Sequence, residues 1–295
     1  MLRMFPVCLP SPPEQQTIVE FLDYETAKID ALIAMQQQLI ALLEEKRQAV
    51  ISHAVTKGLN PDAPMRDSGV EWLGEVPEHW TVSKVGHQTQ IYRGKFTHRP
   101  RNEPRFYGGQ YPFIQTGDVS KSSKYITEHT QTLNEKGFLI SREFPKGTLC
   151  MVITGAKTGS VAILDFVACF PDSIVGFYPK HAEKGAEYLF YAFQALKQYF
   201  DSVAVVSTQE NLNVERISGA KWAWPPPDEQ VEIAKHLAFT LERMKLIEQN
   251  SALLVELLQE RRTALISAAV TGKIDVRGWK PPSSAAKSET EMEVA

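Results

Sequence analysis

The stretch EQQTIVEFLDYETAKIDALIAMQQQLIALLEEKRQAVISHAVT, residues 14–56, decides the fold, because it recurs in diverged form later in the chain. The second copy reads EQVEIAKHLAFTLERMKLIEQNSALLVELLQERRTALISAAVT and occupies residues 229–271. The copies keep one register without a gap, 215 positions apart. Chance does not sustain such a register, so the two stretches are an internal duplication.

Each copy is predicted to form one long helix. Prolines precede both copies, neither Gly nor Pro interrupts them, and Gly58 and Gly272 follow them. At about 1.5 Å per residue, roughly 43 residues give a rod of about 60 Å.

Apolar residues recur at alternating spacings of three and four in both copies, which predicts that the two helices pair as an antiparallel coiled coil. Polar residues interrupt the pattern at matching places, such as Gln36 and Ser251, and are expected to fix the register. The alternative is that each helix packs separately on a globular body. The residues expected to pair are Leu22, Ile29, Leu32, Gln36, Leu39, Leu43, Val50, Leu237, Met244, Ile247, Ser251, Leu254, Leu258 and Leu265.

The region between the copies has a different texture, with most of the glycines and short β-branched runs at residues 148–154 and 160–164. One amphipathic helix is expected near residues 187–200. The predicted fold class is therefore α+β, a strand-rich globular domain on an antiparallel two-helix coiled-coil stalk. The expected boundaries are a remnant of a missing second globular domain at 1–13, the first long helix at 14–57, a linker at 58–66, the globular domain at 67–224, the second long helix and its exit at 225–275, and a disordered tail at 276–295.

Composition narrows the function classes. The formal net charge is −3, so any attraction to a polyanion must be local. The three cysteines are widely separated, which argues against a zinc site or a disulfide framework. No apolar run approaches the roughly 18 residues of a membrane span, and the N-terminus lacks the pattern of a signal peptide. These features predict a cytoplasmic protein without membrane contact.

A basic loop carries the strongest local charge. Five Arg and Lys side chains lie between Arg93 and Arg105 against the single acid Glu103. Glycine and prolines indicate a loop, and aromatic residues are interleaved with the charges. Such a loop suits phosphate contacts and base reading by Arg. The alternative is a solvated surface loop.

Two polar clusters are further candidates for DNA contact, at residues 115–118 and 208–211. Gln and Asn can bond adenine in a bidentate way, although the same residue types also cap turns. Residues 155–159 do not match the ATP-binding loop pattern and are expected to turn a hairpin that touches the DNA backbone. The complete set of expected DNA contacts is Arg93, Lys95, His98, Arg99, Arg101, Asn102, Arg105, Tyr107, Gln115, Thr116, Lys121, Lys157, Thr158, Thr208, Gln209 and Asn211.

Catalytic patterns are missing from the sequence. We find no amino-methyltransferase motif, no Glu-x-Lys nuclease pattern after Pro171-Asp172, and no histidines at metal-ligand spacing. We therefore expect no catalytic residue, no metal and no cofactor bound by this chain.

Five segments of the sequence resemble the specificity subunits of type I restriction–modification systems. They are residues 65–80, 109–118, 170–174, 208–213 and 226–230, and the resemblance covers essentially residues 1–275. It implies that residues 67–224 are a target-recognition domain for double-stranded DNA. It also implies docking to methyltransferase subunits, which bind S-adenosylmethionine, and to an ATP-driven restriction subunit.

The chain departs from this family by having one recognition domain where members normally have two. It is therefore expected to be either a half-length subunit that pairs with a second copy or an inactive truncated relic. The runner-up from another class is a coiled-coil scaffold whose globular domain binds protein. A stand-alone methyltransferase or nuclease is disfavoured by the missing motifs.

Overall fold

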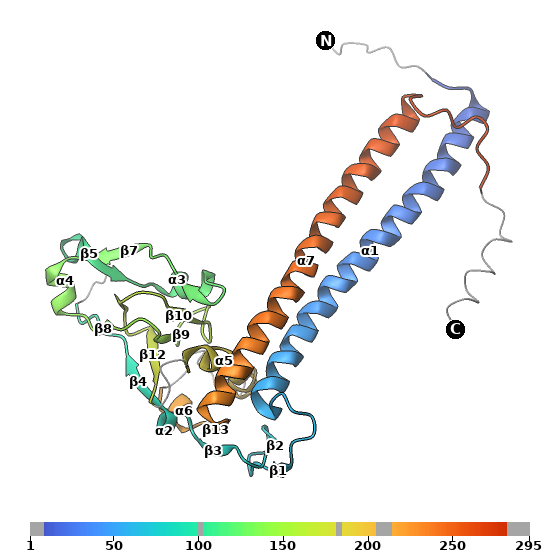
Figure 1. Ribbon diagram of the computed structural model, residues 1–295. Coiled ribbons are helices and arrows are strands. Elements are labelled where there is room, and N and C mark those ends of the chain that lie inside the picture. The colour runs from blue at the N-terminus through green and yellow to red at the C-terminus, as the bar shows by residue number, and fades with distance from the viewer. Residues whose placement is uncertain (1–8, 99–102, 181–184, 205–213, 282–295) are drawn as a thin grey trace. The chain divides into compact units, whose positions relative to one another are not determined.

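The computed structural model describes residues 9–98, 103–180, 185–204 and 214–281 (Figure 1). It divides into two compact units. The stalk unit comprises Met1–Lys46 and Glu242–Ala295, and the head unit comprises Arg47–Leu241. Helices α1 (Pro12–Lys57) and α7 (Pro227–Val270) contribute residues to both units.

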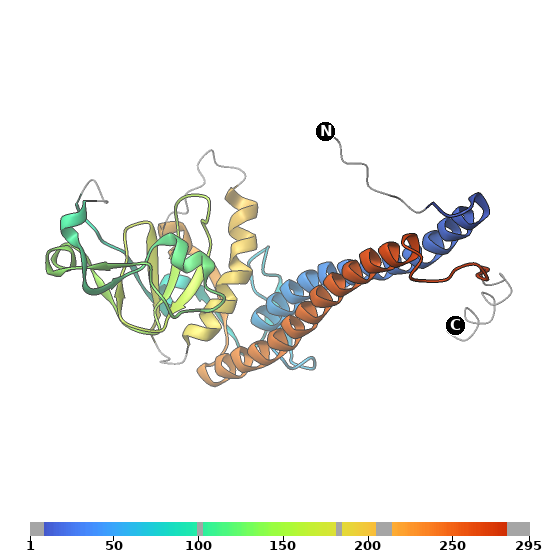
Figure 2. The same ribbon diagram turned by 90° about the horizontal axis from the view of Figure 1, so that it is seen from above.

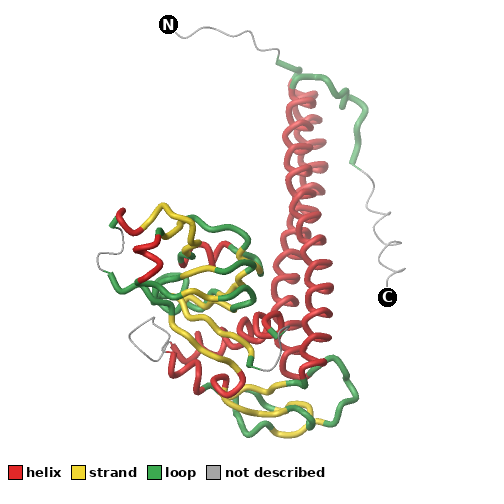
Figure 3. Tube along the Cα trace, turned by 60° about the vertical axis from the view of Figure 1, so that its left-hand side comes forward, coloured by secondary structure: helices red, strands yellow, loops and turns green. Residues whose placement is uncertain are grey.

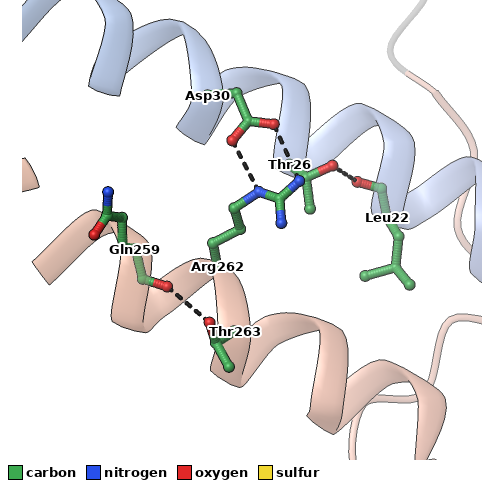
Figure 4. Close-up of polar contacts among 6 residues, drawn as sticks. All are labelled: Leu22, Thr26, Asp30, Gln259, Arg262 and Thr263. Atoms are coloured by element: carbon green, nitrogen blue, oxygen red, sulfur yellow. Dashed lines mark hydrogen bonds and ion pairs between the residues drawn. The ribbon is translucent and has the colours of Figure 1, made fainter. Parts of the chain in front are cut away.

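Within the stalk unit, α1 and α7 lie side by side and antiparallel (Figures 1 and 3). Arg262 of α7 bridges to Asp30 of α1, with 2.8 Å between Nε and Oδ1 and 3.3 Å between Nη2 and Oδ2 (Figure 4). This two-pronged contact shows how the two helices are aligned along each other. The predicted antiparallel pairing is confirmed, and the alternative of two separately packed helices is wrong.

Four of the residues expected in the seam were assigned wrongly. Leu32, Leu39, Ile247 and Leu254 are 44, 36, 46 and 41% exposed, whereas Ile29, Met244, Ser251 and Leu258 are buried as expected. The half-buried positions next to the exposed ones are Ile33, Ile40, Glu248 and Val255. The reason is that the sequence offers apolar residues at adjacent positions, such as 32 and 33, and either could continue a heptad pattern. The other expected seam residues in this unit, Leu22, Gln36, Leu43 and Leu265, are half-buried.

The segment after α7 folds back onto α1. The Trp279 ring lies 5.6 Å from that of Phe21 and 5.7 Å from that of Tyr24, and Val276 is buried. Val276 and Trp279 are therefore packed, and the expectation of a disordered tail beginning at residue 276 is wrong for residues 276–279. Residues 282–295 of that tail, and most of the expected remnant at residues 1–13, lie outside the described residues.

A five-stranded sheet forms the centre of the head unit. Its strands follow the order β4 (Thr89–Arg93), β12 (Ile174–Pro179), β9 (Leu149–Val152), β10 (Val161–Leu164) and β6 (Tyr125–Ile126). All neighbouring strands are antiparallel except β10 and β6. Helix α5 (Ala186–Ala204) covers one face of this sheet (Figure 2). The two β-branched runs and the amphipathic helix are thus confirmed as β9, β10 and α5.

The other face of the sheet packs against a second layer. That layer holds β7 (Gln131–Leu133), β5 (Tyr107–Phe113), β11 (Ala168–Cys169) and β8 (Glu143–Phe144), with the short helices α3 (Thr116–Lys121) and α4 (Glu135–Leu139) and the 3-10 turn η1 (Pro104–Phe106). Cys150 and Val152 of β9 point into it and pack against Val119 and Phe170. A separate small core contains Phe96, Phe106 and Phe113 among others.

The base of the head unit joins the globular domain to the two helices. Its elements are β1 (Met65–Asp67), β2 (Glu75–Pro77), β3 (Thr81–Lys84), α2 (Val85–Gln88), α6 (Val214–Gly219) and β13 (Lys221–Trp224). Trp80 and Trp222 are fully buried here, together with Leu237 of α7 and packed against Val50 of α1. Glu229 accepts a hydrogen bond from Trp80 Nε1 at 3.1 Å. Val50 and Leu237 therefore belong to this core.

Candidate nucleic-acid interface

Arg93 ends β4, which is an edge strand of the five-stranded sheet. Its Nε donates to the Asp172 carbonyl oxygen at 2.7 Å. The next residue, Gly94, lies so close to the Phe170–Asp172 turn that an added Cβ would stand 2.2 Å from the Pro171 carbonyl oxygen. Only glycine fits this approach. The turn therefore holds Arg93 and the exposed Lys95 at a fixed place.

Topology brings Lys157 to the same end of the sheet. Strand β12 lies between β4 and β9, and its Val175 pairs with Arg93 on one side and with Met151 on the other. The turn at residues 153–160 continues from that end of β9 and carries the exposed Lys157. Two basic groups 64 positions apart in the sequence thus share one sheet end.

The turn itself is the expected hairpin. Gly155 and Gly159 both have positive φ, 87° and 86°, which favours glycine at each position. The Thr158 hydroxyl donates to the Gly155 carbonyl oxygen at 2.6 Å. Thr158 is therefore occupied in holding the turn, while Lys157 is presented outward.

Two residues at this end of the sheet were not among those predicted from the sequence. The Arg142 guanidinium lies over the ring of Tyr92, with its Cζ 5.5 Å from the ring centroid, and Tyr92 is 47% exposed. Arg142 Nη1 also reaches the Arg93 carbonyl oxygen at 3.4 Å. Arg142 stands alone among acidic and apolar neighbours in the sequence, so no local signal could have found it.

Several side chains of the expected basic loop contact one another. Glu103 forms an ion pair with Arg105 at 2.6 Å and a hydrogen bond with the His98 ring. Arg105 also lies over the Phe106 ring, and the half-buried Tyr107 ring stacks on Phe96 at 5.8 Å. These contacts reduce the charge and the freedom that the loop offers to a ligand. The expected contacts Arg99, Arg101 and Asn102 lie outside the described residues.

The polar cluster at residues 115–118 has a structural role. Gln115 Nε2 donates to Gln131 Oε1 at 2.7 Å, and Asp118 accepts the Gln115 backbone N–H at 2.8 Å. These bonds hold the start of α3, as the alternative of turn capping expects. Thr116 is half-buried and Lys121 exposed on the same helix. The other cluster, with Thr208, Gln209 and Asn211, falls outside the described residues.

The two cysteines described in the head unit, Cys150 and Cys169, are buried. Burial raises the pKa of the Cys169 thiol to about 11 and also raises the pKa of Cys150, so both stay protonated. Across the described ranges, no three His, Cys, Asp or Glu side chains gather as metal ligands. None of the described helices combines the length and hydropathy that crossing a membrane requires.

One polar network lies beside α5. Glu187 accepts from Lys124 Nζ at 2.7 Å and from the Tyr125 hydroxyl at 2.6 Å. Partial burial acts to raise the pKa of Glu187, but these two hydrogen bonds outweigh it and the pKa is lowered. Burial and the bond to Glu187 raise the pKa of Tyr125. The network ties β6 to the start of α5.

Comparisons with known proteins point to one and the same protein family. Residues 77–256 match the family model described as "Type I restriction modification DNA specificity domain". A stretch of 172 residues, 57% of the chain, is 26% identical to the "Type I restriction enzyme MjaIX specificity subunit" of Methanocaldococcus jannaschii. That stretch covers 39% of the relative's length.

Solved structures share the fold. One, described as "Structural basis underlying complex assembly and conformational transition of the type I R-M system", matches 91% of this chain with a TM-score of 0.70 at 16% identity. The HsdS subunit from Thermoanaerobacter tengcongensis matches 91% of it with a TM-score of 0.55 at 14% identity. This chain covers 62% and 60% of those two chains, so it spans less than two thirds of each.

Proposed function

Because the chain belongs to the type I restriction–modification DNA specificity family, we propose that its head unit reads a half-site in double-stranded DNA. Specificity subunits are the non-catalytic members of these systems. We propose residues 67–224 as the recognition domain. The observation that carries the proposal is that the exposed basic residues Arg93, Lys95 and Lys157 lie at the same end of the five-stranded sheet. Local positive charge of this kind attracts DNA although the whole chain is slightly acidic.

Selection from a random-sequence duplex pool tests this function directly. The chain should enrich one short motif, and its affinity for that duplex should fall steeply as salt rises, because bound phosphates release counterions. A duplex of the same composition in shuffled order should bind more weakly by a factor of about 10³ or more. Equal affinity for both duplexes would favour an inactive relic, and no DNA binding in any salt would favour the protein-binding scaffold.

For the stalk unit, we propose docking to methyltransferase subunits. The support is an exposed apolar face formed by Leu32, Met35, Leu39, Leu42, Ile247, Leu254 and Leu257. Residues 31–43 and 249–255 contain no charged side chain. A helix that is apolar or neutral around its circumference is normally covered.

The duplication explains why these residues share a face. A two-fold axis that relates two antiparallel helices places equivalent positions on the same side of the pair. Leu32 corresponds to Ile247 and Leu39 to Leu254 in the repeat. An amphipathic helix pair from the partner would complete a four-helix arrangement over this face.

Mass measurement of the purified chain, alone and mixed with its methyltransferase subunit, tests the docking. We propose that S-adenosylmethionine binds to the methyltransferase subunits and that ATP binds to a restriction subunit. Formation of a stable complex that Leu39→Asp and Leu254→Asp abolish would support the proposal. Pairing of two half-length chains stays a prediction. A mass of two copies without the methyltransferase would reveal it.

A further inference from the structure

We propose that Arg142 and Arg93 form a paired clamp on one DNA phosphate backbone, and that Tyr92 positions Arg142 for it. This inference rests on the proposed DNA-binding function and assigns a phosphate-binding role rather than a base-reading one. Neither Arg142 nor Tyr92 belongs to the basic loop that the sequence singles out. Both lie where the edge strand β4 ends.

The first argument is that both guanidinium groups are held in place before any ligand arrives. The Tyr92 ring supports one face of the Arg142 guanidinium, and the Arg93 carbonyl oxygen accepts from its Nη1. The neighbouring Ser141 hydroxyl donates to the Lys95 carbonyl oxygen at 2.8 Å, which fixes the segment that carries Arg142. Groups ordered in advance lose less entropy on binding.

The second argument is that neither guanidinium is neutralised. Arg93 and Arg142 donate to main-chain carbonyl oxygens, and within the described part of the chain neither forms an ion pair. Arg105 provides the contrast, because it also lies over an aromatic ring but is paired with Glu103 at 2.6 Å. The exposed positive charge at this end of the sheet therefore includes Arg93 and Arg142, which contact each other, together with Lys95 and Lys157.

The third argument concerns what the pair can bind. A guanidinium presents a planar fork of donors that matches phosphate oxygens in a bidentate way. Arg93 and Arg142 are anchored through their own contacts to the sheet edge. Side chains anchored in this way suit a phosphate backbone that passes over the surface, whereas base reading requires groups that enter a groove. A backbone contact also tolerates any base sequence.

The experiment compares Arg142→Gln with Lys221→Gln in the full chain. Lys221 is an exposed residue of the separate β3–β13 sheet, where it stands opposite Lys84, so its replacement removes the same charge without breaking an attractive contact. The probes are a duplex that the wild-type chain selects from a random pool and a shuffled duplex of the same composition. Affinities are measured from 50 to 200 mM salt.

Arg142→Gln should weaken both duplexes by the same factor and reduce the slope of log K against log salt by about 0.9. Its fold-loss should consequently shrink about 3.5-fold between 50 and 200 mM salt. Tyr92→Leu should weaken binding in the same direction but less, and Arg142→Lys should fall between wild type and Arg142→Gln because it keeps the charge and loses the fork. Lys221→Gln should retain the wild-type slope.

Three results would overturn the clamp and leave the proposed function standing. Loss of discrimination between the two duplexes in Arg142→Gln, with an unchanged salt slope, would make Arg142 a base reader. Equal effects of Arg142→Gln and Lys221→Gln would show that Arg142 contributes only through its positive charge and not through a specific contact. Wild-type affinity in both Arg142→Gln and Arg93→Gln would remove these residues from the interface while leaving the proposed function standing. If the wild-type chain binds neither duplex, with or without its methyltransferase partner, the proposed function and the clamp both fail.

Discussion

Substitution of two adjacent leucines in α7 tests the helix–helix seam and the apolar face separately. Leu258 is 8% exposed and packs in the seam, whereas Leu257 is 52% exposed on the apolar face. Leu258→Ala should lower the free energy of unfolding of the isolated chain by about 2–3 kcal/mol, since a buried Leu→Ala change costs about 2–5 kcal/mol and a two-helix seam lies at the low end. Leu257→Ala removes the same atoms and should cost less than about 0.5 kcal/mol, because Ala is the better helix former and half of the leucine is already in water.

Urea unfolding followed by far-UV circular dichroism measures both variants, with an unchanged denaturant slope as the check on two-state behaviour. Binding to the methyltransferase subunit should show the opposite order. Leu257→Ala should weaken binding roughly fivefold through the apolar area that docking would bury, and Leu258→Ala should leave it nearly unchanged under conditions where the chain is folded. Equal destabilisation by the two substitutions would refute the seam described above. Equal partner affinity for wild type and Leu257→Ala would refute the docking face.

Three further predictions concern single contacts. Glu229→Ala should lower the free energy of unfolding by about 1–3 kcal/mol, because it leaves the buried Trp80 indole N–H without an acceptor, while Glu229→Gln should cost less; tryptophan fluorescence during urea unfolding reports both. Glu187→Gln should be less stable than wild type above about pH 5, and the difference should vanish as the pH falls through the lowered pKa of Glu187, because a carboxylate with a lowered pKa stabilises the fold only while it is ionised. The difference should stay below about 1 kcal/mol, since the carboxylate is 41% exposed, and Lys124→Gln should remove the same dependence. Trp279→Ala should release the segment after α7 from α1, so that limited proteolysis cuts residues 271–281 faster than in wild type without unfolding the helices.

The stalk could be predicted because repetition doubles the signal. Two copies of one pattern at a fixed offset indicate two equal helices, and matching polar interruptions indicate that they pair. The choice between neighbouring apolar residues could not be made. Leu32 and Ile33 both continue a heptad pattern, and only the position of the opposite helix decides that Ile33 enters the seam and Leu32 does not. The duplication repeats the same ambiguity at Leu254 and Val255, so the second copy could not resolve the first.

The candidate interface was only partly predictable, for a related reason. Charge density along the sequence points to residues 93–105, yet in that loop Glu103 forms an ion pair with Arg105 and a hydrogen bond with His98. Arg142 reaches the same sheet end through an isolated bridge between Phe96 and Ser141, 45 positions apart, which no local pattern encodes. The density of charged residues along the sequence cannot distinguish charges that are neutralised within the fold from charges that are exposed to a ligand, because the difference depends on long-range packing.

The ion pair between Asp30 and Arg262 joins residues 232 positions apart, and this separation sets an order of events during synthesis. At about 5–20 residues per second, roughly 10 to 45 seconds pass between the two residues leaving the ribosome. Throughout that interval the nascent first helix holds its uncharged middle, residues 31–43, without the complementary helix. Most of the head can fold meanwhile, its base is completed once Trp222 and Leu237 have been made, and the rod closes last. Until then the waiting helix exposes apolar surface that a chaperone, or a partner made alongside it, would protect from aggregation.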